Sequence, residues 1–353
     1  TIPNTVKKIG DGAFSQCSNL TSITIPDSVI DIGVGAFIGC SNLISISIPN
    51  SVTSIGGGAF QECSSLKSII MSDSISTIYS DTFYRCQNLT DITIPTSVTS
   101  IENEAFSGCI NLSTISIPNS VTSIGIRTFW NCEKLVDITI PTSVASIGRY
   151  AFDLTPWLEK KQKEDPLVIV NGILINGKSC EGNITLPNTV KSICDEAFSF
   201  NINLTAITIP DSVTYIGGYA FSDCRSLVSV KTPDSVTFLG EAAFYRCTKL
   251  KNVTLSNALT IIQDNTFEAC KSLTQITIPN SVSSIGAVAF RDCKNLKYIT
   301  ISNKVKKIKY GAFGECNDNL IMYGYDNPFI QKYAKENKIG FKTLAINKPN
   351  ATI

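Results

Sequence analysis

Cysteine is the residue type in this sequence with the widest range of possible chemistry. The chain of 353 residues contains 13 Cys and no His. Thiols form disulfides, bind metal ions and act as nucleophiles. The lack of His excludes Ser-His-Asp and Cys-His pairs, imidazole zinc ligands and acid–base catalysis by His. What remains possible depends on how the Cys are spaced.

Eleven of the Cys are separated by 23 residues or a multiple of 23, namely Cys17, Cys40, Cys63, Cys86, Cys109, Cys132, Cys224, Cys247, Cys270, Cys293 and Cys316. If the segments between them stack like neighbouring strands, about 4.8 Å apart, parallel side chains hold the sulfurs too far apart for a bond of about 2.05 Å. We therefore predict buried free thiols that pack as small apolar groups, with no disulfide, metal or cofactor. Cys180 and Cys194 lie outside the series, and a bond between these two stays open.

Two carboxylates give the only hint of catalysis. Asp91 and Asp137 share one position of the repeat, two repeats apart, which is about 10 Å by strand spacing. Inverting glycosidases need a similar separation. A solvated polar face accounts for the same two residues, so we predict that the chain is not an enzyme and keep a carbohydrate-cleaving enzyme as an alternative.

The 23-residue period also governs Phe and Pro, and it defines the elements that position every side chain. Thirteen of the 17 Phe occupy one position of the repeat, from Phe14 to Phe313. In a typical unit, Leu43, Ile46 and Ile48 form the L-x-x-L-x-L pattern of a leucine-rich-repeat strand. Ile46 and Ile48 alternate with Ser45 and Ser47, as a half-buried strand requires.

The rest of the unit predicts a second inward segment and a tight turn. Pro49 ends the strand because it has no N–H to donate. Val52 and Ile55 then point inward, and the spacing of Phe60 and Cys63 predicts a short helical or 3₁₀ turn. A unit this small can bury its apolar face only against copies of itself. The predicted fold is a β-rich, α/β-type leucine-rich-repeat solenoid, a curved stack of about 13 repeats with parallel strands.

The repeated motif I-P-x-S-V-x-x-I-G-x-x-A-F-x-x-C-x-x-L, seen for example over residues 25–43, closely resembles the BspA-type leucine-rich repeats. The resemblance covers residues 1–316 apart from one interruption. It implies a mostly parallel β-solenoid that is extracellular or displayed on the cell surface. Some members of the family are adhesins for host matrix or plasma proteins. The family supplies no shared catalytic residue to carry over.

The period is interrupted between Pro141 and Pro187, which are 46 residues apart, or two periods. Thr155 and Pro156 predict a helix start, with the helix over 157–163. The segment 167–175 predicts a hairpin around Asn171-Gly172, a pair that suits a type I′ turn. The preserved length favours a degenerate coil that keeps the repeats in register; an inserted ligand platform is the alternative.

After Cys316 the sequence predicts a C-terminal cap: a strand over 320–323, a helix over 329–338 that begins at Asn327 and ends at Gly340, and a strand over 341–344. The first repeat has no such cap and no leader, which favours a chain that continues before Thr1. The predicted organisation is one continuous domain, with solenoid halves at 1–153 and 185–316, the interruption at 154–184, the cap at 317–344 and a loose tail at 345–353.

Large side chains of the kind that dominate protein interfaces gather in the fourth to seventh repeats. Tyr84 and Trp130 directly follow the repeated Phe and should point outward. The candidate protein-binding surface is Tyr84, Arg85, Arg127, Trp130, Arg149, Tyr150 and Trp157. Scattered surface residues are the alternative interpretation. A separate column of Ser and Thr on the strands is interpreted as a solvated face; it contains Thr24, Ser47, Thr93, Ser116, Thr139, Thr208, Thr254, Thr277 and Thr300.

Charge and hydropathy exclude several classes of partner. The formal net charge is +1, so the sequence predicts no nucleic-acid partner. No run of 18 apolar residues is present, so no membrane insertion is predicted. We expect a monomeric, extracellular or cell-surface scaffold that binds a protein, such as a host matrix or plasma protein. The alternative is a passive spacer within a longer chain.

Overall fold

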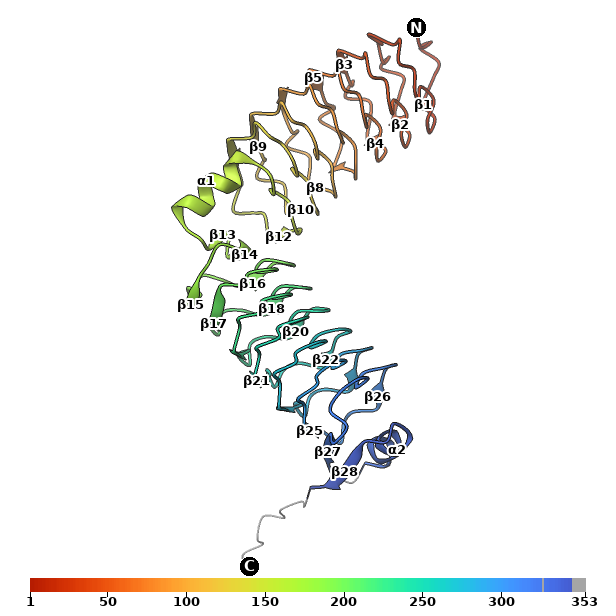
Figure 1. Cartoon of the computed structure of the whole chain (residues 1–353). Coiled ribbons are helices and arrows are strands. Elements are labelled where there is room, and N and C mark those ends of the chain that lie inside the picture. Colours follow the sequence, from red (N-terminus) through yellow and green to blue (C-terminus); the bar gives the residue numbers. More distant parts are fainter. Residues whose placement is uncertain (326, 345–353) are drawn as a thin grey trace, which may run out of the picture. The chain divides into compact units, whose positions relative to one another are not determined.

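Short strands and tight turns account for almost the whole chain in the computed structural model, which describes residues 1–325 and 327–344 (Figure 1). The chain divides into two compact units, Thr1–Asp165 and Pro166–Ile353. Each unit is a stack of coils of about one repeat. Most coils carry two strands, one after the repeated Leu (the A strand) and one after the repeated Pro (the B strand).

In the first unit the A strands are β3 (Ser45–Ser47), β5 (Ser68–Ile70), β7 (Asp91–Ile92), β9 (Thr114–Ser116) and β11 (Asp137–Thr139). The B strands are β1 (Lys8–Ile9), β2 (Asp31–Ile32), β4 (Ser54–Ile55), β6 (Thr77–Ile78), β8 (Ser100–Ile101), β10 (Ser123–Ile124) and β12 (Ser146–Ile147). The unit ends with helix α1 (Pro156–Glu164).

In the second unit the A strands are β15 (Gly182–Thr185), β17 (Leu204–Thr208), β19 (Ser229–Lys231), β21 (Asn252–Thr254), β23 (Gln275–Thr277), β25 (Tyr298–Ile301) and β27 (Ile321–Gly324). The B strands are β14 (Ile173–Asn176), β16 (Ser192–Ile193), β18 (Tyr215–Ile216), β20 (Phe238–Leu239), β22 (Ile261–Ile262), β24 (Ser284–Ile285) and β26 (Lys307–Ile308). Strand β13 (Val168–Val170), helix α2 (Pro328–Glu336) and strand β28 (Gly340–Thr343) complete it.

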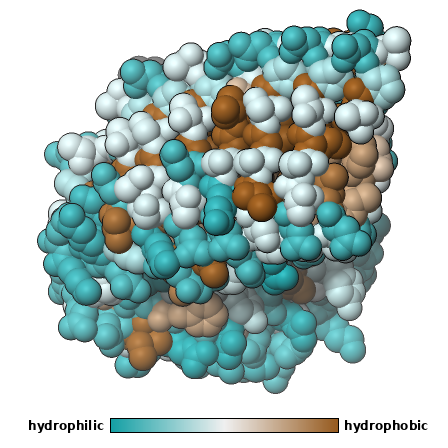
Figure 2. Space-filling model, turned by 90° about the horizontal axis from the view of Figure 1, so that it is seen from above, coloured by the Kyte–Doolittle hydropathy of each residue, from teal (hydrophilic) through white to brown (hydrophobic). Residues whose placement is uncertain are grey.

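The strands of successive coils pair in parallel, and the partners are one repeat apart. Ile124, for example, pairs with both Ile101 and Ile147. In most of the short strands an aliphatic residue points into the coil and a polar residue points to solvent, as in the exposed–buried–exposed pattern of β9. In Figure 2, rows of pale residues accordingly alternate with brown apolar rows. The predicted parallel leucine-rich-repeat solenoid is confirmed within each unit.

The repeated Phe forms the centre of the core. Within each unit, neighbouring rings of this column lie 5.0–5.8 Å apart and within 15° of parallel. Eleven of the rings are among the largest fully buried side chains, from Phe37 to Phe290. In the end coil Phe14 is half-buried, and Cys17 is exposed.

The turn that carries this Phe differs in detail from the predicted helical turn. Ala59, Gln61 and Cys63 donate their N–H groups three residues back, as in a 3₁₀ helix, but Phe60 and Glu62 donate to the next coil. The coil achieves this by placing Gly58 and Glu62 in the left-handed region, at φ of 64° and 59°. A helix cannot contain such residues, so the segment is a series of turns.

The Cys column has a role that the spacing alone did not reveal. None of the thirteen cysteines forms a disulfide, Cys180 and Cys194 included. Ten of them donate a hydrogen bond from Sγ to the carbonyl oxygen of the Phe one coil back, as Cys63 does to Phe37 at 3.1 Å. Burial and then the neighbouring thiol raise the pKa of Cys63 from 9.0 to about 12. These ten thiols therefore join adjacent coils, and burial, which raises the pKa of each, holds them protonated.

The interruption forms the predicted elements. Thr155 caps α1, since its Oγ1 accepts from the N–H of Leu158 at 3.2 Å. Strands β13 and β14 form an antiparallel hairpin, and Asn171 and Gly172 take φ of 52° and 81°, as a type I′ turn requires. Strand β14 pairs with β16, so the hairpin is the first layer of the second unit.

The C-terminal cap also forms, with one correction. Asn327 caps α2 as predicted, accepting from Phe329 at 3.0 Å. Gly340 does not end the helix: Lys338 is the left-handed residue (φ 58°), and the N–H of Ile339 bonds to the oxygen of Ala334. Gly340 instead begins β28, which pairs with β27. The predicted tail at 345–353 lies outside the described residues.

The stacked Phe column should dominate stability. We expect Phe221→Ala, in the middle of the second unit, to lower the free energy of unfolding by about 3–5 kcal/mol because it leaves a cavity between two rings. Phe200→Ala removes the same atoms from a side chain that is 67% exposed and should cost less than about 1 kcal/mol. Urea unfolding followed by circular dichroism measures both, and equal losses would contradict the assignment.

The buried thiols should make stability fall at alkaline pH. The unfolded chain loses Cys protons above about pH 9, whereas folded Cys63 keeps its proton until about pH 12. The native state then binds more protons, so the free energy of unfolding decreases as pH rises through this window. The urea midpoint between pH 8 and 10.5 tests this. Cys63→Ser should show a shallower decline, and an unchanged slope would contradict the explanation.

Candidate functional site

Six of the seven predicted binding residues lie at the surface of the first unit, on the turns that follow the B strands. We call Tyr84, Arg85, Arg127, Trp130, Arg149 and Tyr150 the lateral band. Tyr84, Trp130, Arg149 and Tyr150 are half-buried, and Arg85 and Arg127 are exposed. The structure therefore places all six side chains at the surface, and that they form a protein-binding surface stays a prediction.

The backbone explains why this surface can vary so freely. Arg85, Arg127 and Tyr150 occupy the two left-handed positions of their turns, with φ between 52° and 59°. Each turn is fixed by bonds between coils, such as the N–H of Arg85 to the oxygen of Ser107 at 2.7 Å. Because the main chain supplies these bonds, the side chain at each position is free to differ from coil to coil.

Arg85 and its neighbours form the first cluster of the band. The guanidinium carbon of Arg85 lies 5.1 Å from the ring centre of Tyr84, within cation–π range. Its Nη1 lies 3.8 Å from a carboxylate oxygen of Glu62 in the preceding coil. Nearby, partial burial and then repulsion from Glu104 raise the pKa of Asp81. The cluster is thus a cation shared between an aromatic ring and a loosely paired carboxylate.

Arg127 repeats this arrangement over three coils. Its Nη1 lies 3.7 Å from Glu104 on one side, and its guanidinium carbon lies 5.7 Å from the ring centre of Tyr150 on the other. Trp130 follows in the same turn, and its carbonyl accepts from the N–H of Gly108 at 2.8 Å. The Trp ring is thereby positioned by a turn whose backbone bonds are satisfied.

These clusters suit recognition of another protein's surface. The ion pairs are long and their side chains are about one-third to one-half exposed, so they contribute little to stability. An arginine in such a pair can exchange its carboxylate for one on a partner at small cost. Aromatic rings beside these arginines supply contact area of the kind that interface hot spots use.

Trp157 is wrongly predicted as a surface residue. Its side chain is only 6% exposed, and its ring packs on Phe152 with 4.8 Å between ring centres. Helix α1 lays Trp157 over the last Phe of the first unit, and its backbone N–H donates to Leu135 at 2.9 Å. The periodic pattern could not reveal this, because the helix leaves the repeat and folds back.

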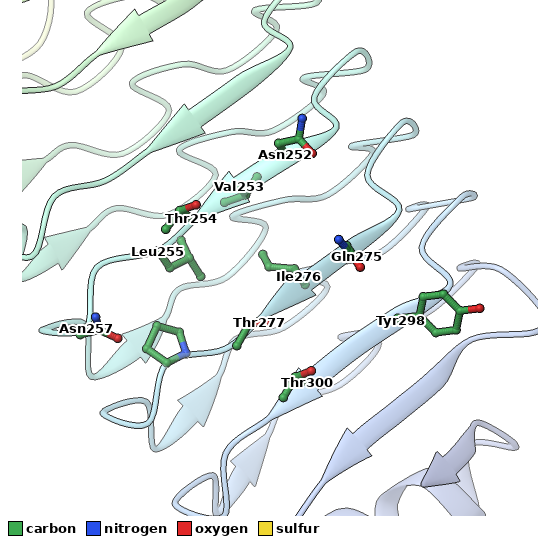
Figure 3. A pocket seen from close by; sticks show the side chains of 11 residues that line it. Asn252, Val253, Thr254, Leu255, Asn257, Gln275, Ile276, Thr277, Tyr298 and Thr300 are labelled. Atoms are coloured by element: carbon green, nitrogen blue, oxygen red, sulfur yellow. The ribbon is translucent and has the colours of Figure 1, made fainter. Parts of the chain in front are cut away.

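A hollow of about 500 Å³ lies on the A-strand face of the second unit (Figure 3). Its wall consists of amides and hydroxyls that alternate with inward apolar residues, and Tyr298 projects at one side. The polar residues are Asn252, Thr254, Asn257, Gln275, Thr277 and Thr300. The lining has no charged group, so this hollow suits a neutral polar ligand.

This hollow includes part of the Ser/Thr column that the sequence indicated as a solvated face. Another strand position lies two residues before this column, and in several earlier coils it holds Ser or Asp. In three successive coils it holds an amide or a phenol instead, at Asn252, Gln275 and Tyr298. That run was the sequence signal for the hollow, and it was missed because the small residues of the other column dominate the pattern.

Asp91 and Asp137 lie on the A-strand face of the first unit, and both are exposed. Asp137 pairs in register with Thr114 of β9, so a Thr separates the two carboxylates. The arrangement is an open sheet surface, whereas a general acid usually needs an apolar enclosure.

Within residues 1–325 and 327–344, no group of three or more His, Cys, Asp or Glu is placed to hold a metal ion. No helix in that part of the chain is both long enough and apolar enough to cross a bilayer.

The fold and its surfaces define a leucine-rich-repeat solenoid protein. The pattern of the BspA type leucine rich repeat region matches residues 1–112, 76–164, 176–294 and 219–342, which is most of the chain. The chain therefore belongs to the BspA-type leucine-rich-repeat family. Leucine-rich-repeat proteins of this kind are typically non-enzymatic.

Solved structures of similar proteins include two from bacteria. A leucine rich cell surface protein from Faecalibacterium prausnitzii is 30% identical over 93% of this chain and 85% of that one, with a TM-score of 0.45. A leucine-rich repeat protein from Bacteroides ovatus is 28% identical over 98% and 94%, with a TM-score of 0.39. No curated protein matches the chain.

The two Trp residues allow a direct test of the site geometry. Trp157→Ala should lower the free energy of unfolding by about 3–5 kcal/mol, since it removes the ring that covers Phe152. Trp130→Ala should change it by less than about 1 kcal/mol. Thermal unfolding measures both. In addition, iodide should quench the fluorescence of Trp157→Phe, which retains Trp130, more than that of Trp130→Phe; the reverse order would refute the burial assignments.

Proposed function

We propose that the chain is a non-catalytic scaffold, secreted or held at the cell surface, that binds another protein through the lateral band. The observation that supports this most is the band itself, because it gathers arginines and aromatic rings on a backbone fixed by bonds between coils. A rigid surface loses little conformational entropy on binding. The proposed partner carries exposed carboxylates that can replace Glu62 and Glu104.

The extracellular location and adhesive role rest on resemblance. The Faecalibacterium relative is described as a cell surface protein, and the family includes adhesins. A host matrix or plasma protein is the partner class we propose first, with the chain acting as a monomer. Parallel strands stacked in register make a stiff support, which suits display of a binding surface.

The neutral hollow on the A-strand face favours a second interaction. Its amides and hydroxyls can pair with the hydroxyls of a sugar, and Tyr298 offers a ring for the apolar face of one. This would be binding and not turnover, since the hollow's lining has no carboxylate. The alternative of cleavage by Asp91 and Asp137 predicts glycan hydrolysis that Asp137→Asn abolishes.

An array of matrix proteins, plasma proteins and neutral glycans tests the proposal. For a protein that binds, Arg127→Ala with Trp130→Ala should weaken affinity at least about 30-fold, as expected for loss of two hot-spot residues. The matched control is Tyr245→Ala with Arg246→Ala, an aromatic–arginine pair on a turn of the second unit, where Arg246 lies 5.9 Å from the ring centre of Tyr245.

The outcomes separate the candidate functions. Binding that the control retains and the Arg127/Trp130 variant loses supports the lateral band. Binding that both variants retain contradicts it, and binding to no array member favours the passive spacer. Hydrolysis of a glycan would contradict the non-catalytic scaffold and favour the alternative that the chain is an enzyme.

A further inference from the structure

The second unit contains a concentrated positive charge that the net charge of +1 conceals. Residues 293–314 contain six Lys and no Asp or Glu. Four of the lysines lie within six residues, in the sequence N-K-V-K-K-I-K-Y over 303–310. We call Lys304, Lys306, Lys307 and Lys309 the lysine patch. Short runs rich in lysine are typical of sites for anionic polymers.

The backbone of the patch is fixed, and its side chains point to solvent. Lys307 lies in β26 and pairs with Ser284 of β24. The N–H of Lys306 donates to the oxygen of Ser283 at 2.9 Å, and the N–H of Lys304 donates to Oγ of Ser302 at 3.0 Å. Val305 is buried between them, so the exposed lysines are held in place on the edge of the coil.

Within residues 1–325 and 327–344, only Lys309 of the four lysines forms an ion pair, although the charge of Lys307 also acts on Asp264. Lys309 binds Asp264, with Nζ 2.8 Å from Oδ1. Over residues 1–325 and 327–344, no carboxylate lies within 4.0 Å of Nζ of Lys304, Lys306 or Lys307. An extended segment of six residues spans about 20 Å, so these charges repel one another over a short distance.

Protection of a strand edge explains only part of this pattern. Strand β26 is the edge of its sheet, and lysines on edge strands discourage pairing with other chains. In the first unit, β1 is likewise the edge of its sheet, and it carries the same V-K-K-I sequence over residues 6–9. There, however, Lys8 pairs with Asp31 at 2.7 Å. Lys304 and Lys309 lie outside β26, so protection of this edge does not require them. It also does not require that Asp and Glu be absent from residues 293–314.

We propose that the lysine patch binds a sulfated polysaccharide. Ammonium groups act as point charges that contact sulfates without a fixed geometry. The neighbouring coil presents hydroxyls at the equivalent positions, Ser283 and Ser284, and hydroxyls suit the polar rim of a sugar chain. Tyr310, which is 91% exposed, offers a ring beside the charges. A nucleic acid fits less well, because it needs an extended basic surface and this patch is one coil wide.

The patch lies in the second unit, apart from the lateral band, so this inference does not rest on the proposed protein-binding function. It adds a partner class that the net charge of +1 does not suggest. The interaction should weaken as salt rises, since it depends on exposed charges.

The experiment compares two double substitutions that remove the same charge from equivalent strands. The full chain is passed over immobilised heparin at 150 mM salt, together with Lys306→Gln/Lys307→Gln and the matched control Lys7→Gln/Lys8→Gln. We expect the first variant to bind about tenfold or more weakly, from the loss of two charge contacts, and the control to bind within about twofold of the original chain. Desulfated heparin should not bind the original chain.

Several results would overturn the proposal. Equal weakening in both variants would indicate a general charge effect, and unchanged binding of the Lys306/Lys307 variant would exclude the patch. Tighter binding of single-stranded DNA than of heparin would make the partner a nucleic acid. The Lys306/Lys307 variant could also self-associate on gel filtration while it still binds heparin. That result would show that the lysines only protect the strand edge. Thermal unfolding confirms that each variant is folded.

Discussion

Each coil is stable only because it packs against the next one. A segment of 23 residues cannot enclose its own Phe, Cys and Leu, whereas in the interior coils these side chains have essentially no exposed surface. The Phe rings stack, the strands pair in parallel and the thiols donate to carbonyls one coil back. All three interactions act between nearest neighbours, so stability grows with each added coil.

This dependence on neighbours separates the constant part of each coil from the variable part. The inward residues must match those above and below, and they hardly change along the chain. The outward residues face solvent and contact only the adjacent coil, as Thr53 does through a hydrogen bond to the carbonyl oxygen of Ile30. The left-handed turn positions illustrate the freedom this allows, since Gly58, Asp81, Glu104, Arg127 and Tyr150 succeed one another in the same backbone conformation.

Charge follows the same division. Ion pairs such as Arg85 with Glu62 link variable residues of adjacent coils, and a single coil can depart from the average, as the coil with the lysine patch does. The net charge of the chain therefore says little about any one surface. A repeat protein of this kind carries separate surfaces on one scaffold, here a lateral band, a neutral hollow and a basic edge.

The sequence by itself determined the period, the parallel solenoid, the buried Cys and Phe columns, the hairpin at Asn171-Gly172 and most of the cap, because each depends on local spacing or turn chemistry. Tertiary structure alone decided that Trp157 is buried, that Gly340 lies in a strand and that Cys bonds to Phe carbonyls. It also decided which arginines meet which rings and carboxylates. Those features depend on where a segment lies against its neighbours in space. A repeat pattern in the sequence gives no information about residues that leave the repeat, and none about contacts between the variable side chains of adjacent coils.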